Sequence, residues 1–372
     1  MIRNVQALRA FAALWVAWYH TLQPVMTGAY GLRATGTPWL RGTGELGWIG
    51  VDVFFVISGF IMAHCTRDVA GGKADACEFM WKRVKRVVPL YWVLTSIVVG
   101  LALALPNFFN SYRFELVHAI KSYLFLPAAR PDGAPLPPLV PGWTLNYEMY
   151  FYFVFGLLVW TGMHRTLRAF VAVFVGSVVV GQWLQRHTPW PTSSMEFLVT
   201  SPLLLEFFAG VLVARAVRHV ALPAWAAVAM IAGGAVLLRY WFIDIPADTV
   251  EPRHVVELYR VLALGIPAVL VVSGAVLLES KWTFPKPVLH LGDASYSIYL
   301  THFFVPGLCA KLFVWSGFAQ VNANLYAATC FVLIAAVGLF FYHYVEMPML
   351  KAWRRQTPAR VTRAPAVKVL LP

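Results

Sequence analysis

The sequence predicts an all-α polytopic membrane protein, with about ten transmembrane helices around an internal polar channel. Of the 372 residues, 59% are hydrophobic and only 13% are charged, whereas a soluble domain carries about 25% charged residues. Apolar runs of about 20 residues, the length that crosses a bilayer, recur along the whole chain. The 15 Trp and 15 Tyr residues are typical of a chain whose rings lie at two membrane interfaces.

The ten apolar runs set the expected topology, with the N-terminus on the cytoplasmic side. An even number of spans puts both termini on one side, and about two thirds of the Lys and Arg residues then fall on that side. We expect residues 1–350 to form one transmembrane domain and residues 351–372 a basic cytoplasmic tail that touches lipid. The runs lie at about 5–24, 46–65, 87–106, 145–162, 167–184, 198–217, 222–242, 258–279, 294–315 and 324–345.

The net charge of +13 does not indicate nucleic-acid binding. The basic residues are spread over short loops between apolar runs rather than along one face. We therefore expect membrane lipids, and no nucleic acid, as partners. The four cysteines, Cys65, Cys77, Cys309 and Cys330, show no paired spacing, so we expect free thiols and no metal site.

The first span carries a cation and an imidazole on one face. Arg9 and His20 are eleven residues apart, which at ~100° per residue falls ~20° away from three full turns. The two side chains lie ~16 Å apart along the axis. Neither group enters lipid cheaply, so this face is expected to meet protein or water.

The second and fourth spans bring two carboxylates into the outer half of the membrane. Asp52 is expected at the depth of His20, with Ser58 and Gly59 near the middle, where small residues let a helix or a thin ligand approach. Glu148 opens the fourth span. A carboxylate beside His20 would orient a general base. Backbone capping or pairing by Asp52, and a helix-packing hydrogen bond by Glu148, are the alternatives.

The third span begins with a cluster of cations at the cytoplasmic mouth. Arg83 and Arg86 are three residues apart and share a face, and Pro89 fits a first helical turn. One interpretation is an ordinary positive-inside anchor. The other is a clamp for an anionic cytosolic ligand, because guanidinium groups bind phosphates bidentately.

The long outer loop at about 107–144 contains an apolar piece, Leu116 to Leu126, and then six prolines from Pro127 to Pro141. It is either a stiff surface connector or a lid over an outward-facing site, since long ordered loops tend to carry function.

The ninth span places polar groups along one helix face. Ser295, Tyr299 and His302 are spaced i, i+4, i+7, and Tyr296 lies beside them. These tyrosines and His302 are expected to line the channel, although a packing role for His302 is an alternative. We expect Asp293 to cap this helix.

Two further acids lie in apolar runs. Glu346, at the inner end of the last span, is explained by pairing with a basic neighbour, whereas Glu206 has no assigned role.

Together, inner cations and an outer imidazole with carboxylates suit an anionic donor from the cytosol and a hydroxyl-bearing acceptor near the outer side. Ion transporters also line their paths with acids and histidines, so the spacing alone leaves transport open.

The motifs, taken in order, resemble the membrane-bound acyltransferase family 3, and the opening NVQALR resembles its exopolysaccharide-modifying branch. The likeness covers nearly the whole chain. It is carried by the Arg–ten residues–His of the first span and by these motifs: GVDVFFVISGF at 50–60, RVKR at 83–86, WTLNYE at 143–148, SYSIYLTH at 295–302 and VEMP at 345–348.

The resemblance implies a bacterial inner-membrane O-acyltransferase that moves acetyl or another short acyl group onto surface glycans. It assigns an essential role to Arg9 and His20 and links Arg83 and Arg86 to the acyl-CoA donor. Threonine replaces the more common serine at position 144.

The expected mechanism is direct transfer. Arg83, Arg86 and Arg9 would hold acetyl-CoA or another acyl-CoA, which is a donor substrate and not a bound cofactor, with its thin arm passing Ser58. His20, held by Asp52 or Glu148, would deprotonate the hydroxyl of a glycan or lipid-linked sugar acceptor. The alternatives are a non-enzymatic transporter of glycan or acyl carrier, and a structural scaffold.

Overall fold

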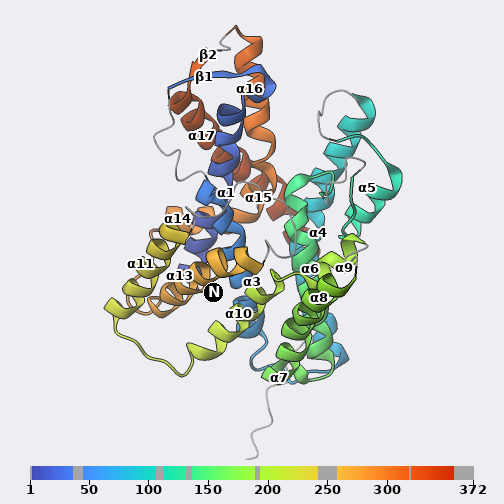
Figure 1. Ribbon diagram of the computed structural model, residues 1–372, viewed down its shortest axis with the longest axis vertical. Coiled ribbons are helices and arrows are strands. Elements are labelled where there is room, and N and C mark those ends of the chain that lie inside the picture. Colours follow the sequence, from blue (N-terminus) through green and yellow to red (C-terminus); the bar gives the residue numbers. More distant parts are fainter. Residues whose placement is uncertain are drawn as a thin grey trace, which may run out of the picture.

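The computed structural model describes residues 2–36, 45–105, 112–130, 136–188, 193–241, 258–317 and 320–355. This part of the chain is built from helices and one pair of short strands (Figure 1). The α-helices are α1 Arg3–Thr27, α3 Ile49–Cys65, α4 Lys73–Ala104, α5 Leu116–Tyr123, α6 Trp143–Trp160, α7 Leu167–Phe170, α8 Gly176–His187, α9 Ser194–Thr200, α10 Leu204–Ala216, α11 Ala224–Trp241, α13 Ile266–Leu277, α14 Lys286–Asp293, α15 Ser295–Thr301, α16 Phe304–Trp315, α17 Ala323–Phe341 and α18 Met347–Arg355.

Short turns of other helix types join or interrupt these elements. The 3₁₀ turns are η1 Ala29–Gly31, η2 Glu45–Trp48, η3 Val140–Gly142 and η4 Met163–Arg165. Three π-helical turns occur inside longer helices, a form that is often found at functional sites. They are η5 Val171–Val175, η8 Val261–Gly265 and η9 Tyr342–Glu346.

The all-α membrane fold is confirmed, and each of the ten predicted apolar runs contains a helix. Within the described residues, five helical stretches are long and apolar enough to cross a membrane, or six if one bent pair is a single span. They are Lys73–Ala104, Leu167–His187, Ser194–Ala216, Leu258–Leu277 and Ala323–Trp353, with Ser295–Thr301 plus Phe304–Trp315 as the bent pair. The number of ten spans stays a prediction.

The ninth predicted span is bent rather than straight. Its two parts, α15 and α16, meet at 47°, and His302 lies at the break. Pro306 explains the position of the break, because a proline has no N–H for the carbonyl four residues earlier and its ring clashes with that carbonyl. The His302 carbonyl instead accepts a hydrogen bond from the Val305 N–H, at 3.2 Å.

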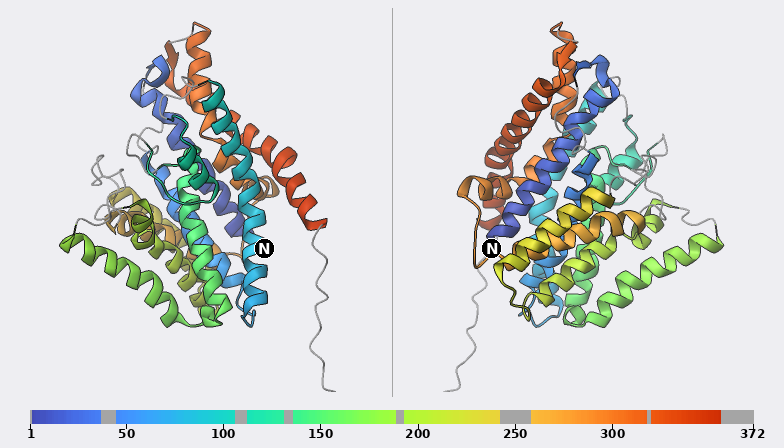
Figure 2. Two further views of the ribbon diagram at one scale, coloured as in Figure 1. Left: turned by 90° about the vertical axis from the view of Figure 1, so that its right-hand side faces the viewer. Right: turned by 60° about the vertical axis from the view of Figure 1, so that its left-hand side comes forward.

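Helix α1 lies along the middle of the molecule and contacts α3, α14, α15 and α17 (Figures 1 and 2). Its buried N-terminal end is held by residues from much later in the chain. The Glu279 carboxylate accepts hydrogen bonds from the backbone N–H groups of Arg3 and Asn4, both at 2.7 Å. The Gln6 amide donates to Asp293 at 2.6 Å, so Asp293 ends α14 and does not cap α15 as expected.

The notch at Ser58 and Gly59 is filled by another helix. A methyl group at Gly59 would overlap the backbone of Phe207 on α10, and one at Gly210 would overlap the backbone of Val56 on α3. The two glycines therefore let α3 and α10 pack at short range, as small residues do in membrane helix pairs. The Gly59 side of the notch is closed to a ligand.

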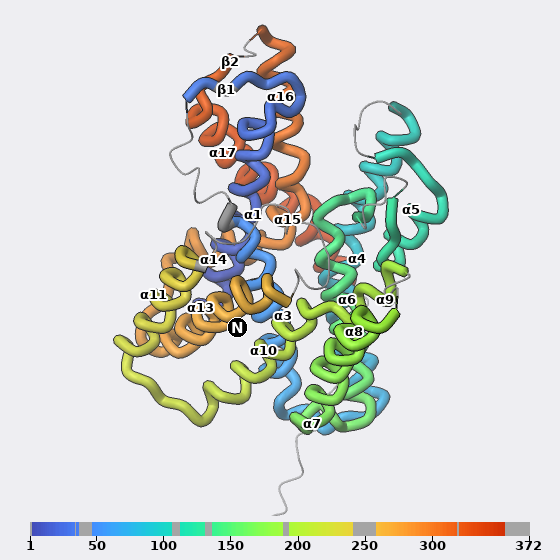
Figure 3. Tube along the Cα trace, viewed as in Figure 1, coloured from blue at the N-terminus to red at the C-terminus, as the bar shows by residue number. Residues whose placement is uncertain are grey.

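A parallel strand pair joins distant parts of the chain at one end of the molecule. Strand β1, Arg33–Thr35, follows α1, and β2, Gln320–Asn322, precedes α17. Their register pairs Arg33 with Gln320 and Thr35 with Asn322, and Figure 3 shows the pair at the tip formed with α16 and α17.

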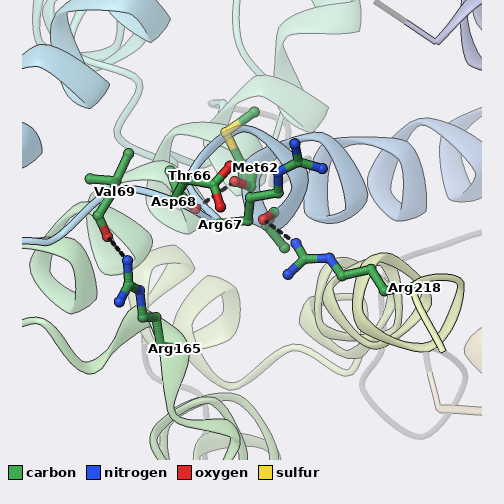
Figure 4. A network of polar contacts seen from close by, with 8 residues as sticks. Met62, Thr66, Arg67, Asp68, Val69, Arg165 and Arg218 are labelled. Carbon is green, nitrogen blue, oxygen red and sulfur yellow. Dashed lines mark hydrogen bonds and ion pairs between the residues drawn. The ribbon is translucent and has the colours of Figure 1, made fainter. Parts of the chain in front are cut away.

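Basic residues from three predicted inner loops, Arg67, Arg165 and Arg218, lie close together (Figure 4). Arg165 donates to the Val69 carbonyl at 2.8 Å, and Arg218 donates to the Ala63 carbonyl at 3.2 Å. Arg67 pairs with its neighbour Asp68 at 2.7 Å. These contacts put the ends of the predicted spans two, four and six together, as the expected topology requires.

Two sequence predictions fall partly outside the described residues. Residues 356–372 of the expected tail lie outside, as do Pro131 and Pro135 of the long loop. The apolar piece of that loop forms α5, which packs on α4: the Trp92 indole donates to the Tyr123 carbonyl at 2.9 Å.

Candidate active site

A cavity of about 410 Å³ lies between α1, the α15–α16 break and the loop before α6. Six of its lining residues are tyrosine, tryptophan or phenylalanine, and two are histidines. None of its described lining residues is an acid, a lysine or an arginine. The lining residues are Val16, Tyr19, His20, Gln23, Pro24, Thr27, Ala29, Tyr30, Gly47, Trp48, Val51, Leu136, Val140, Pro141, Trp143, Tyr299, His302, Phe303, Pro306 and Gly307.

The two imidazoles of the cavity face each other. The ring centroids of His20 and His302 are 5.0 Å apart, with the planes inclined by 38°. His20 is half-buried on α1, whereas His302 is fully buried at the α15–α16 break. Each histidine is followed four residues later by a proline, Pro24 or Pro306, that also lines the cavity.

The protonation pattern of His302 follows from its backbone contact. Its Nδ1 lies within hydrogen-bond distance of the Tyr299 carbonyl, and a carbonyl can only accept, so Nδ1 carries the proton. In a neutral imidazole the other nitrogen then holds a lone pair. That nitrogen, Nε2, is buried and has no hydrogen-bond partner.

Asp52 does not hold His20 as expected. It is fully buried and pairs with Arg260 at 3.1 Å. Val51 lines the cavity, and the next residue on a helix points ~100° away, so Asp52 faces α13 and η8 instead. The Arg260 guanidinium lies 5.4 Å from the Trp48 ring and 5.8 Å from the Trp143 ring. The pair therefore supports two aromatic walls of the cavity.

Glu148 also lies away from His20. Its carboxylate accepts hydrogen bonds from the Ser58 hydroxyl at 2.9 Å and from the Tyr152 hydroxyl. Trp143 lines the cavity, and Glu148 follows it by five residues, which is ~7.5 Å further along α6. Glu148 lies within the electrostatic reach of Arg9, so it belongs with Arg9 and not with the cavity.

Arg9, Arg83 and Arg86 form one cluster, as their predicted common role requires. Arg9 interacts electrostatically with Arg83 and Asp293 as well as with Glu148, and Arg86 lies within the electrostatic reach of Arg9. We call the three arginines the inner arginine cluster.

The two arginines of α4 are held differently. The Arg86 guanidinium pairs with Glu346, whose other carboxylate oxygen accepts from the Ser297 hydroxyl at 2.6 Å. The pairing expected for Glu346 is thus confirmed. Arg83 lies 5.7 Å from the Phe79 ring, and its Nε has no hydrogen-bond partner. Arg83 is therefore better placed than Arg86 to receive a new anion.

Helix α15 spans the distance between the inner arginine cluster and the cavity. The Tyr296 ring lies 5.5 Å from the Arg86 guanidinium, and its hydroxyl donates to the Val87 carbonyl at 2.7 Å. Tyr299, one turn on, lines the cavity and bonds the Thr144 hydroxyl at 2.9 Å. The two tyrosines and His302 thus follow each other from the cluster into the cavity. A continuous polar channel stays a prediction.

The predicted lid contributes to the roof of the cavity. Leu136, Val140 and Pro141 from the long loop line it. His118 on α5 holds this segment, because its Nε2 donates to the Leu136 carbonyl at 3.0 Å. Burial lowers the pKa of the His118 ring below its ordinary value of 6.5.

Sequence reasoning missed Arg260 and the two tryptophans. Arg260 lies inside the predicted run 258–279, and an arginine within a span is itself a signal of a functional role. Trp48 and Trp143 could not be told apart from interface tryptophans without their positions in space. Glu206 is buried beside Gly265, and this position gives it no part in the cavity.

Comparison with known proteins identifies the family to which the chain is similar. A family model described as an acyltransferase domain, of the acyltransferase 3 type, matches residues 2–344. The chain is 33% identical over 327 residues to the exopolysaccharide production protein ExoZ of Rhizobium meliloti, covering 85% of this chain and 93% of ExoZ.

Two further relatives are longer than this chain. The O-acetyltransferase OatA of Staphylococcus aureus is 25% identical over 368 residues, and the peptidoglycan O-acetyltransferase OatA of Listeria monocytogenes is 23% identical over 379 residues. The matches cover 94% of this chain in both cases, but only 57% and 56% of the two relatives. The chain thus spans little more than half the length of the OatA proteins. No solved structure matches.

Proposed function

This chain belongs to the acyltransferase 3 family, and from that premise we propose that it is a membrane O-acetyltransferase of a bacterial surface glycan or exopolysaccharide. The donor would be cytosolic acetyl-CoA or another short acyl-CoA. The observation that carries the proposal is the division of the site into a cationic part and an aromatic cavity with two imidazoles, joined by α1 and α15.

The inner arginine cluster suits the donor. Acyl-CoA carries phosphates, and guanidinium groups bind phosphate oxygens bidentately. The relevant free donor atoms belong to Arg83, whose Nε has no hydrogen-bond partner. Arg9 lies on the same helix face as His20, ~16 Å away along the axis. A donor held at Arg9 and Arg83 would therefore extend its acyl end towards His20.

The cavity suits a sugar acceptor. Six aromatic rings line it, and they offer flat apolar surfaces with a polar edge for Tyr and Trp. The tyrosines, Gln23 and Thr27 supply hydrogen bonds. The names of the relatives point in the same direction: ExoZ is called an exopolysaccharide production protein, and OatA an O-acetyltransferase.

In the proposed reaction His20 is the general base. It takes the proton from an acceptor hydroxyl while the hydroxyl oxygen forms a bond to the thioester carbonyl carbon. The carbon–sulfur bond then breaks, and the thiolate of CoA takes the proton back from His20. The acyl group ends as an ester on the glycan, and free CoA leaves. In this proposal the protein lies in the bacterial inner membrane with both termini in the cytoplasm.

The test is mass spectrometry of surface glycans from cells that carry the intact gene, no gene, or the His20→Ala variant. We expect the mass of an acetyl or other short acyl ester only with the intact gene. His187→Ala, at an exposed ring on α8, is the matched control and should behave as wild type. Normal acylation with His20→Ala, at equal protein level, would show that His20 is not the base. A change in glycan export without any change in acylation would favour transport.

A further inference from the structure

The base of the proposed reaction lacks a carboxylate partner in its cavity. A histidine that takes a proton becomes a cation, and a buried cation is costly unless a neighbour shares its proton or charge. Asp52 is bonded to Arg260, and Glu148 to Ser58 and Tyr152. The described cavity lining holds no acid.

His302 has the features that such a partner requires. Its Nδ1 proton is fixed on the Tyr299 carbonyl, so Nε2 presents a lone pair. This nitrogen is buried, has no hydrogen-bond partner and belongs to a ring 5.0 Å from that of His20. A buried acceptor without a hydrogen-bond partner is rare, since buried polar atoms are almost always paired.

We propose that His302 is the positioning residue of His20: its Nε2 accepts the N–H of one ring nitrogen of His20 and stabilises the positive charge that His20 gains when its other ring nitrogen removes the proton of the acceptor hydroxyl. The inference rests on the proposed function and adds to it. His302 keeps its own Nδ1 proton throughout, the N–H between the two rings stays on His20, and the proton taken from the acceptor hydroxyl passes from the other nitrogen of His20 to the CoA thiolate. The pair thus takes the place of the histidine–carboxylate pair of other acyl-transfer sites.

The surroundings of the pair leave it isolated. The titratable groups that line the cavity besides the two histidines are Tyr19 on α1, Tyr30 on η1 and Tyr299 on α15. The Asp52–Arg260 pair lies behind Trp48 and Trp143. None of the three tyrosines is an anion at neutral pH, so His302 is the available proton acceptor of the described lining.

Two substitutions separate the two ring nitrogens of His302. His302→Asn keeps an N–H near the Nδ1 position that donates to the Tyr299 carbonyl, but it removes Nε2. His302→Gln places an amide oxygen near the Nε2 position, where it can accept the His20 proton. We expect kcat to fall by about 10²-fold in His302→Asn, to recover partly in His302→Gln, and KM for acyl-CoA to stay unchanged in both.

The pH profile distinguishes proton sharing from a packing role. Sharing favours the charged form of His20, so its loss in His302→Asn should move the acid limb of kcat towards lower pH. The matched control is His164→Gln: His164 is also buried, its Nε2 bonds a backbone carbonyl, which a Gln amide can replace, and its Nδ1 has no partner. It lies far from the cavity on η4, and its substitution should leave the profile unchanged.

The measurements use the full-length protein in lipid vesicles with acetyl-CoA and the acylated glycan as readout, after a thermal-unfolding check. Should His302→Asn unfold, His302→Ala with added imidazole replaces it, and recovery of activity by imidazole supports the proposal. Wild-type kcat and an unmoved acid limb in His302→Asn would overturn it. If the wild-type protein itself is inactive, the proposed function is contradicted, and the inference that rests on it fails as well.

Discussion

Arg83 and Arg86 lie one turn apart on α4, yet the structure gives them different surroundings. Arg86 is committed to Glu346 and Tyr296, whereas Arg83 rests on Phe79 with a free Nε. The sequence predicts that the two arginines share a helix face and that they hold the donor together with Arg9. It could not predict which of them is already neutralised, because Glu346 comes from a helix some 260 residues later.

We expect Arg83→Ala to raise KM for acyl-CoA by about 10- to 100-fold, because a charge-assisted hydrogen bond contributes about 1.5–3 kcal/mol. Arg86→Ala should mainly lower the melting temperature, since it leaves the buried Glu346 carboxylate without its cation. Steady-state kinetics and thermal unfolding of the purified variants measure both effects. Lys82→Ala, which removes only an exposed pair with Glu78, is the control. Equal KM effects for Arg83→Ala and Lys82→Ala would argue against a specific contact.

The Asp52–Arg260 pair was not predicted, because the expected depth of Asp52 along its span does not say which face of α3 it occupies. We expect Asp52→Ala to lower stability by about 3–5 kcal/mol, as for other broken buried pairs. The double variant Asp52→Leu, Arg260→Met should regain stability, yet its KM for the acceptor should rise, because Trp48 and Trp143 lose their support. Thermal unfolding and acceptor titrations test this. If the double variant binds the acceptor normally, the pair is structural only.

At the scale of helices, the sequence located the elements well but not their interruptions. All ten predicted apolar runs contain helices, because apolar length is a strong signal. The break at His302 was missed although Pro306 marks it, since the apolar run continues across it. Helix α1 has the same spacing of histidine and proline, His20 and Pro24, but it continues through Pro24 to Thr27.

The contact between α3 and α10 depends on glycine. We expect Gly59→Ala to reduce folded protein strongly, because the added methyl group meets the backbone of Phe207 and not a flexible side chain. Gly100→Ala on α4 is the matched control, because nothing lies near a methyl group there. Size-exclusion profiles and melting temperatures of detergent-solubilised protein compare the two. Equal melting temperatures of the two variants would mean that α3 and α10 can move apart without loss of stability.

The roof held by His118 should be sensitive to acid. The buried ring has a pKa below 6.5 in the folded protein. At pH values just below 6.5 the unfolded chain therefore binds more protons than the folded protein. The stability of the folded state accordingly falls as the pH falls through this window. We expect the melting temperature to be lower at about pH 5 than at about pH 7.5. The decrease should be smaller in His118→Gln, which keeps a donor for the Leu136 carbonyl. An equal decrease in both proteins would exclude His118 as the cause.

For the whole molecule, the sequence predicted which loops share a side, and the meeting of Arg165, Arg218 and residues 63–69 at one end agrees with it. The native cysteines allow the orientation in the membrane to be measured. Cys65 and Cys77 are exposed near this end, whereas Cys309 and Cys330 are buried. The four are free thiols, as expected.

We expect a membrane-impermeant maleimide to label the protein in inverted membrane vesicles but not in intact spheroplasts, because Cys65 and Cys77 would face the cytoplasm. With these two replaced by serine, a Ser316→Cys variant at the exposed turn after α16 should show the opposite pattern. Labelling of the native cysteines from the outside would reverse the assigned orientation.

The strand pair β1–β2 has a consequence for how the protein is made. Strand β1 is synthesised long before its partner, Gln320–Asn322, because the two strands are far apart in the sequence. At about 5–20 residues per second, roughly 15–60 s pass between the two. During that interval α1 has neither its strand partner nor the Glu279 and Asp293 contacts of its N-terminal end. A chain that stops before residue 320 therefore lacks the strand that ties the segment after α1 to the segment before α17.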